Sequence, residues 1–135
     1  DLTAAAARSR GINWTFAPML DVCRDPRWGR IAEGFGEDAW LTSVMAGAFV
    51  RGLQASPEES LLACPKHFAG YGASESGLDY NRTYISDIEL FNVYFPPFAA
   101  AFDAGAIKVM PSFSDVNGQP GAGCDVVIRK STQVR

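Results

Sequence analysis

Three arginines and a tryptophan gather in one short stretch, the sequence CRDPRWGR at residues 23–30. The arginines are Arg24, Arg27 and Arg30, and Trp28 lies between the last two. A guanidinium group carries a planar set of donors that can bind a carboxylate or two neighbouring hydroxyl oxygens of a sugar. The indole of Trp28 can offer its apolar face to the C–H face of a sugar ring. These residue types together suit carbohydrate binding.

A structural role would explain the same residues. An ion pair between an arginine and a nearby acid would brace the loop, and Trp28 would then cap the core. The acidic residues close in sequence are Asp21, Asp25, Glu33 and Glu37. For Arg24 and Arg27 we favour bracing. For Arg30, which follows Gly29 and so allows a close backbone approach, both interpretations stay open.

Lys66 and His67 are a second pair of candidates, at the end of the apolar run LLACPKHF, residues 61–68. Neighbouring side chains of a regular strand point to opposite faces, so both reach one ligand only where the strand bends. His67 is the single histidine of the chain, and a lone histidine is more often structural than reactive. Cys64 and His67 have C-x-x-H spacing, but no second pair would complete a metal site. We therefore expect no bound metal.

Other reaction types lack the residues that they need. The sequence contains no G-x-S-x-G motif, and no serine stands out as a partner for His67. Gly34 and Gly36 in EGFGED resemble a phosphate loop weakly, but the Lys-Ser/Thr pair of a P-loop is missing and acidic neighbours would repel phosphate. A nucleophilic triad and a phosphate site are both disfavoured.

Composition limits the partners of the chain. With 135 residues, of which 47% are hydrophobic, it has the size and makeup of one globular domain. The net charge of −3 supplies no positive field for nucleic acid, and no run approaches the roughly 18 apolar residues of a membrane span. We expect neither partner. Three widely spaced cysteines suit free thiols better than disulfides, which fits a reducing or lightly oxidising compartment.

Strands and helices alternate in the predicted order of elements. Three apolar runs, residues 12–22, 61–68 and 107–113, read as strands. Residues 2–10 read as the end of a helix that stops at Gly11. Residues 38–55 read as an amphipathic helix capped by Asp38. The apolar face predicted for it consists of Leu41, Val44, Met45, Ala48, Phe49 and Gly52.

A further helical region lies between the second and third runs. Ser86 and Glu89 form the S-x-x-E pattern of a capping box at its start. Pro96 and Pro97 would break a continuous helix, so we predict one short helix to about residue 94 and a second from the prolines to just before Gly105.

The succession of strand, long loop and helix, with no hairpin signals between, predicts an α/β fold with parallel βα units. A doubly wound sheet and part of a (β/α)8 TIM-type barrel both fit this order. In a barrel, reactive groups collect in the loops after successive strands, as CRDPRWGR and KHFAGYGASE do here. We therefore favour a partial barrel of about three βα units. Its open sheet edges would promote self-association.

Three stretches resemble glycoside hydrolase family 3, close to its bacterial β-glucosidase branch. They are NWTFAPMLDVCRDPRWGRIAEGFGED, KHFAGYGASESGLDYN and YFPPFAAAFDAGAIKVMPSFSDVNGQP, in the order and spacing of the family's N-terminal (β/α)8 barrel. The resemblance covers residues 1–120, and the tail at residues 121–135 departs from the family pattern. The family's N-acetylglucosaminidase branch has KHFPGHG where this chain has KHFAGYG, which favours the β-glucosidase branch.

The resemblance implies a retaining β-glucosidase that removes terminal β-linked glucose from oligosaccharides or glucosides. In that mechanism an aspartate attacks the anomeric carbon and a glutamate protonates the leaving oxygen, without any cofactor. The positions that bind sugar hydroxyls in the family correspond to Arg30, Lys66 and His67. Tyr80 and Met110 are further pocket-lining candidates.

Neither catalytic carboxylate is assigned within these residues. The family's nucleophile lies in an S-D-W or S-D-H motif, which this sequence lacks, and Asp115 in SFSDVNG matches a different region. The acid/base glutamate belongs to a later domain in the family. We therefore expect a catalytically incomplete fragment that keeps part of the sugar subsite. The alternative is a non-catalytic sugar-binding or structural remnant. A bacterial periplasmic or cytoplasmic location fits both.

Overall fold

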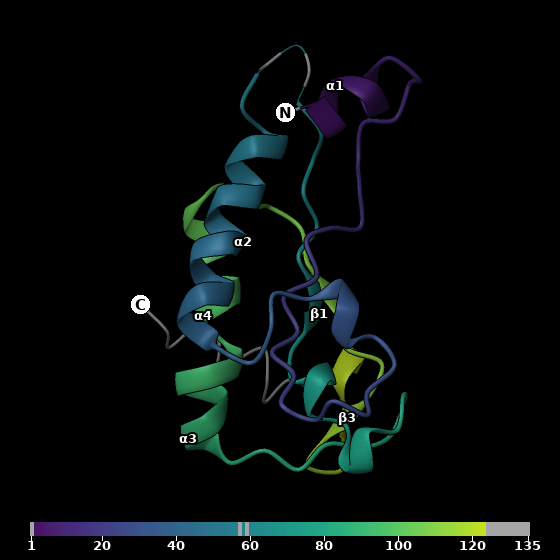
Figure 1. Ribbon diagram of the computed structural model, residues 1–135, viewed down its shortest axis with the longest axis vertical. Coiled ribbons are helices and arrows are strands. Elements are labelled where there is room, and N and C mark those ends of the chain that lie inside the picture. The colour runs from purple at the N-terminus through teal and green to yellow at the C-terminus, as the bar shows by residue number, and fades with distance from the viewer. Residues whose placement is uncertain (1, 57, 59, 124–135) are drawn as a thin grey trace.

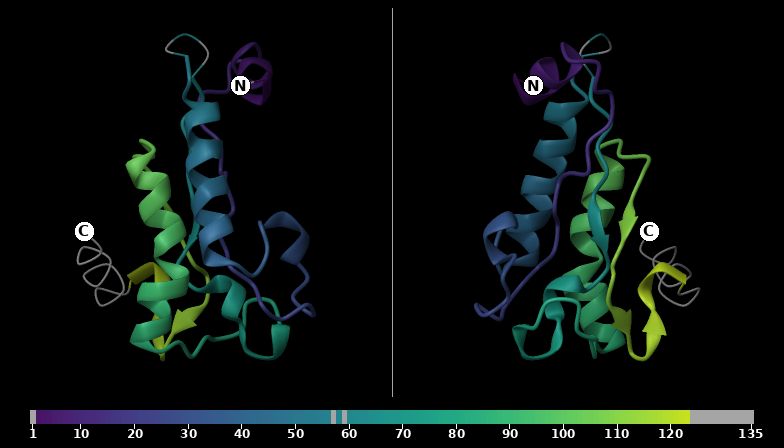
Figure 2. Two further views of the ribbon diagram at one scale, coloured as in Figure 1. Left: turned by 60° about the vertical axis from the view of Figure 1, so that its left-hand side comes forward. Right: turned by 90° about the vertical axis from the view of Figure 1, so that its right-hand side faces the viewer.

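The structure, a computed structural model, describes residues 2–56, 58 and 60–123. Its main helices and its extended segments form two layers (Figure 1). The two longest helices, α2 (Ala39–Leu53) and α4 (Pro96–Asp103), pack against each other, and both views of Figure 2 show the same pairing. The predictions for Cys124 and for the tail after residue 123 lie outside the described residues.

The three apolar runs lie next to one another and run in parallel. Strand β1 (Lys66–Phe68) pairs in parallel with β2 (Met110–Pro111). The first run joins the other side of the second run through two isolated parallel bridges, Trp14 to Leu62 and Met19 to Lys66. Regular strand is shorter than predicted, because prolines at positions 18, 65 and 111 lack the N–H group that a continuous ladder needs.

A small hairpin follows the third run. Strands β3 (Asp115–Val116) and β4 (Gln119–Pro120) pair antiparallel. Both turn residues have positive φ, 54° at Asn117 and 81° at Gly118, as a type I′ turn requires. The sequence analysis missed this hairpin, although Asn-Gly is the dipeptide that signals such a turn.

Helix α2 begins where it was predicted to begin. The Asp38 side chain accepts a hydrogen bond from the backbone N–H of Leu41 at 2.6 Å, which confirms the N-cap. The predicted buried face is wrong, since Leu41, Val44, Met45 and Phe49 are 38–47% exposed. The buried residues of α2 are Thr42, Ala46, Gly47, Val50 and Leu53. The predicted face and the observed buried face of α2 both have helical spacing. Periodicity alone therefore could not tell which of the two faces packs against the rest of the chain.

The other helical elements are short. They are α1 (Leu2–Arg8), α3 (Asp87–Glu89), the π-helix η4 (Leu90–Tyr94), and the 3-10 turns η1 (Ile31–Glu33), η2 (Tyr71–Ala73), η3 (Glu75–Gly77) and η5 (Gly121–Gly123). The capping box of Ser86 and Glu89 is present at α3, and α4 begins at the prolines, as predicted. None of the helices in the described part of the chain has both the length and the hydrophobicity for a bilayer crossing.

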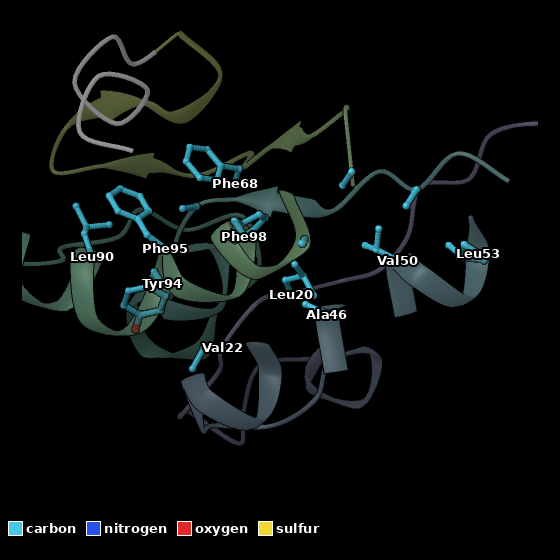
Figure 3. Close-up of a cluster of buried hydrophobic side chains, with 14 of the residues drawn as sticks. Leu20, Val22, Ala46, Val50, Leu53, Phe68, Leu90, Tyr94, Phe95 and Phe98 are labelled. Carbon is cyan, nitrogen blue, oxygen red and sulfur yellow. The ribbon is translucent and has the colours of Figure 1, made fainter. Parts of the chain in front are cut away.

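The hydrophobic core fills the space between the two layers. Phe68 of β1 stacks on Phe95 with ring centroids 5.6 Å apart and meets Phe98 of α4 edge to face at 5.0 Å. Figure 3 labels these rings together with Leu20 of the first run and Val50 of α2, which belong to the same buried cluster. This packing fixes β1 against α4, so the end of β1 is a rigid base for the loop that follows it.

We expect Phe98→Ala to lower the free energy of unfolding by about 3–5 kcal/mol, because the ring is 2% exposed and its loss leaves a cavity against Phe68. Phe102→Ala in the same helix is the matched control, since Phe102 is 41% exposed and should lose less than about 1 kcal/mol. Urea denaturation measures both, and equal losses would contradict the packing described.

Candidate functional site

Two loops meet at the ends of the first run and of β1. Trp28 belongs to the first loop and Tyr71 to the second, and their rings contact edge to face at 5.1 Å. The indole Nε1 of Trp28 and the hydroxyl of Tyr71 both donate to Oδ1 of Asp79, at 3.0 and 2.6 Å. Trp28 is only 1% exposed, so the structural interpretation of this residue is right and its ring face is not open to a sugar.

A buried pair joins the ends of two adjacent runs. Asp21 Oδ2 lies 2.7 Å from Nδ1 of His67 and also accepts a hydrogen bond from the His67 backbone N–H at 3.2 Å. Their side chains are 0% and 2% exposed. Burial raises the pKa of Asp21, and the hydrogen bonds and charge of His67 act against that rise. The contact engages Nδ1, so Nε2 is the ring nitrogen that Asp21 does not occupy.

Sequence reasoning considered Asp21 only as a partner for an arginine and missed its contact with His67. The two residues are separated by 46 positions, and no local motif connects them. The signal that could have found the pair is topological. Both residues lie near the carboxyl ends of neighbouring parallel runs, where side chains from different strands meet.

Arg30 is held in place on two sides. Its Nε and Nη2 donate to the two carboxylate oxygens of Glu33, at 2.7 and 2.8 Å. Its Cζ lies 5.6 Å from the centroid of the Tyr71 ring. The hydrogen bonds from Arg30 lower the pKa of Glu33, and those to Glu33 raise the pKa of Arg30. The side chain stays 21% exposed, so the ion pair orients Arg30 without burying it.

The other two arginines differ from each other. Arg27 donates from Nη2 to Oδ2 of Asp25 at 2.6 Å and is 68% exposed, which confirms the predicted bracing role. These hydrogen bonds lower the pKa of Asp25 to about 2. The bracing predicted for Arg24 is wrong for the described part of the chain, where no carboxylate lies within ion-pair distance of this exposed residue.

The contacts among Arg30, Glu33, Tyr71 and His67 form one cluster. Lys66 is next to His67 in β1. It is half-buried, and the register of β1 with β2 shifts between Lys66 and Phe68, which is the irregularity that the adjacent Lys-His pair required. Met110, another candidate, is the cross-strand partner of Lys66. The charges of Lys66 and His67 both contribute to lowering the pKa of Glu33, after the larger effect of Arg30. Of the three main candidates, Arg30 contacts the Glu33 carboxylate directly, and Arg30 and His67 both contact the Tyr71 ring.

Two exposed aromatic rings border the cluster. Tyr80, a predicted pocket residue, is 66% exposed, and its ring lies 6.2 Å from that of Tyr71. Phe113 meets Tyr80 at 5.6 Å, edge to face, and lies 5.8 Å from the His67 ring. Sequence reasoning missed Phe113, although it ends the third apolar run, as Lys66 and His67 come near the end of the second. The rings form an apolar border beside charged donors.

The donor set suits hydroxyl groups better than metal ions. The described residues contain no group of three or more His, Cys, Asp or Glu that could hold a metal. Cys23 and Cys64 are buried free thiols, and burial raises the pKa of each. Arginine, lysine and imidazole side chains instead supply N–H donors, which are the groups that bind the hydroxyls of a polyhydroxylated ligand.

Nearby carboxylates are already engaged in structural contacts. Asp21 pairs with His67, Glu33 with Arg30, and Asp79 accepts from Tyr71 and Trp28. Asp115 accepts a hydrogen bond from the backbone N–H of Gly118 at 3.1 Å within the hairpin turn.

Comparison with known proteins identifies relatives of one kind. Residues 1–132 match the sequence profile of the glycosyl hydrolase family 3 N terminal domain. The periplasmic β-glucosidase of Salmonella typhimurium is 48% identical over 122 residues, which are 88% of this chain and 16% of that protein. The β-xylosidase of Formosa agariphila is 42% identical over 125 residues, 87% of this chain and 17% of that protein.

A solved structure agrees with these matches. The crystal structure of β-glucosidase from Listeria innocua in complex with gluconolactone has a TM-score of 0.93 and 42% sequence identity, and the match covers 98% of this chain and 19% of that one. The chain therefore spans less than a fifth of the length of each of these three proteins.

Asp21→Ala should lower the free energy of unfolding by about 3–5 kcal/mol, because it leaves the buried His67 without the partner that satisfies its ring and its backbone N–H. Asp25→Ala removes an exposed ion pair from the same loop and serves as the control, with a much smaller loss. Denaturant titration of both variants tests this, and a stable Asp21→Ala protein would contradict it.

Proposed function

Because the chain belongs to glycoside hydrolase family 3, whose N-terminal domain is a TIM-type barrel, we propose that it supplies part of the sugar-binding subsite of a retaining β-glucosidase. The observation that carries the proposal is that Arg30 and His67 both contact the Tyr71 ring, at 5.6 and 4.9 Å, with Lys66 next to His67 in β1. The substrate would be a terminal β-linked glucose of an oligosaccharide or glucoside.

Residues 1–120 would form about three βα units of the barrel. Three parallel runs are present, with α2 between the first and second runs and α4 between the second and third, which supports this division. In such a barrel the loops after the strands form the ligand site. The loops that contain Arg30 and Tyr71 have that position.

Arg30, Lys66 and His67 would bind hydroxyl groups of the sugar next to the bond that breaks. Hydrogen bonds from charged donors contribute on the order of 1.5–3 kcal/mol each. Those that shorten as the sugar ring flattens toward the transition state accelerate the reaction, rather than only tightening substrate binding. Arg30 is suited to this because Glu33 uses Nε and one bond of Nη2, which leaves further N–H groups for a ligand.

The nucleophilic aspartate and the acid/base glutamate would come from parts of the protein outside these 135 residues. The described carboxylates near the cluster have structural partners, and the chain spans only 16% of the Salmonella relative and 19% of the Listeria protein. A retaining mechanism needs two free carboxyl groups about 5–5.5 Å apart. It needs no metal or organic cofactor.

We propose the bacterial periplasm or cytoplasm as the location, and the periplasmic relative of Salmonella favours the former. Under the alternative, a non-catalytic remnant, the same residues would bind sugar or serve only the fold. Calorimetric titration with glucose separates these two forms of the alternative.

In the complete protein that contains these residues, Arg30→Ala should lower kcat/KM for an aryl β-glucoside roughly ten- to one-hundred-fold, the equivalent of one charged hydrogen bond. Arg27→Ala, in the same loop but paired with the exposed Asp25, should stay close to the unsubstituted enzyme. Steady-state kinetics measures both variants, and equal effects would count against a sugar-binding role for Arg30.

The 135-residue chain by itself is the negative control for that assay. It should show no turnover, since it would lack both catalytic carboxylates. Turnover by the purified chain that Arg30→Ala abolishes would refute the assignment of the carboxylates to other parts of the protein.

We also propose that the isolated chain associates with itself, through its open sheet edges and through exposed apolar surface on α2. Trp40, Leu41 and Val44 of α2 are 72%, 43% and 47% exposed, and contiguous apolar surface of this kind favours association. Light scattering coupled to size exclusion should show oligomers whose size depends on concentration. Changing Trp40 and Val44 to lysine should shift the chain toward the monomer. A monodisperse monomer before substitution would rule the proposal out.

A further inference from the structure

Asp79 joins two buried aromatic side chains from different loops. A single carboxylate oxygen, Oδ1, accepts hydrogen bonds from the Tyr71 hydroxyl at 2.6 Å and from Trp28 Nε1 at 3.0 Å. Tyr71 is 0% and Trp28 1% exposed, so water cannot readily replace this acceptor. The position of both rings therefore depends on one side chain.

A close approach at Gly77 brings the loop of Asp79 to this position. Its loop touches the arginine loop at Gly77, where φ is +67°. A Cβ added at Gly77 would lie 2.9 Å from Cβ of Arg27 and 3.1 Å from the carboxylate of Asp25. Any larger residue would push the two loops apart. The close approach at Gly77 and the hydrogen bonds of Asp79 thus both hold the same two loops together.

The Tyr71 ring connects Asp79 to Arg30 and His67, two of the residues proposed to bind the sugar. The guanidinium carbon of Arg30 lies 5.6 Å from the ring centroid. The imidazole of His67 meets the same ring edge to face at 4.9 Å. The hydrogen bond at the hydroxyl restrains the position of this ring, and with it the surface that Arg30 and His67 both contact.

The charge of Asp79 suits this role. Burial acts to raise its pKa, but hydrogen bonds from Tyr71 and Trp28 outweigh that effect and the pKa lies below its ordinary value. Asp79 is therefore ionised near neutral pH, and an ionised acceptor makes shorter and stronger hydrogen bonds than a neutral one.

We propose that Asp79 is a positioning residue for the sugar site, which fixes the Tyr71 ring and thereby the places of Arg30 and His67. Asp79 itself does not need to touch the sugar. The kinetic consequence rests on the proposed function, whereas the geometric consequence concerns only these side chains.

Substitutions at position 79 in the complete protein test the proposal. Asp79→Ala removes the acceptor and should lower kcat/KM for an aryl β-glucoside about tenfold or more, because a displacement of about 1 Å can lower a rate about 100-fold. Asp79→Asn keeps an acceptor oxygen in the same place and should restore kcat/KM to within about threefold of the unsubstituted enzyme. Glu75→Gln, which loses only an exposed pair with Arg82 in the same loop, should leave kcat/KM unchanged.

Two kinetic results would overturn the proposal. One is an Asp79→Ala enzyme whose melting temperature falls while kcat/KM stays the same, since Asp79 would then only stabilise the fold. The other is an Asp79→Asn enzyme that loses as much activity as Asp79→Ala while Arg30 and the Tyr71 ring keep their places, since activity would then not follow the position of these side chains. If Asp79→Ala fails to fold, Asp79→Ser replaces it, because its shorter side chain cannot reach both donors.

Crystal structures of the variants decide the geometric part without any activity. Arg30 and the Tyr71 ring should be displaced in Asp79→Ala and unmoved in Asp79→Asn. Unmoved side chains in Asp79→Ala would overturn the inference. A complete protein that does not hydrolyse β-glucosides would contradict the proposed function and leave these structures to decide the role of Asp79.

Discussion

The buried contact between Asp21 and His67 is the interaction on which the site depends. It ties the first run to the end of β1, and so fixes the starting points of the two loops that hold the cluster. Removing two ionisable groups from water is unfavourable, and well-packed apolar residues could stabilise the same place at least as well. The pair instead sets the orientation of the imidazole ring, because Asp21 engages its Nδ1.

The rest of the site depends on how closely the loop with Trp28 and the loop with Tyr71 approach each other. Added at Gly72, a Cβ would collide with the backbone carbonyl of Val22, so only glycine lets the second loop lie against the end of the first run. At Gly77, farther along that loop, an added Cβ would meet side-chain atoms of Arg27 and Asp25. With the backbones this close, Trp28 and Tyr71 can share Asp79 as one acceptor. The positions of the candidate binding residues therefore depend on glycines that let the two loops lie close together.

Local patterns predicted the features that depend on neighbouring residues. Three such predictions are confirmed: the Asp38 cap, the capping box of Ser86 and Glu89, and the helix start at Pro96. Each depends only on residues within one helical turn. The buried face of α2 was not predicted correctly, because the two candidate faces differ only in what lies opposite them. The contacts of Asp21 with His67 and of Asp79 with Trp28 were not predicted for the same reason, since their partners lie 46 and 51 residues away.

The ion pair between Arg30 and Glu33 bears on how a sugar would bind. An arginine free in solution must lose rotamer freedom when it engages a ligand, which opposes binding by about 0.5–1.5 kcal/mol per side chain. Glu33 and Tyr71 impose that order in advance. The same acid neutralises part of the positive charge, and this lowers the attraction for anions while leaving N–H groups for neutral hydroxyls. Such a cluster therefore favours a neutral polyol over a phosphate or carboxylate ligand.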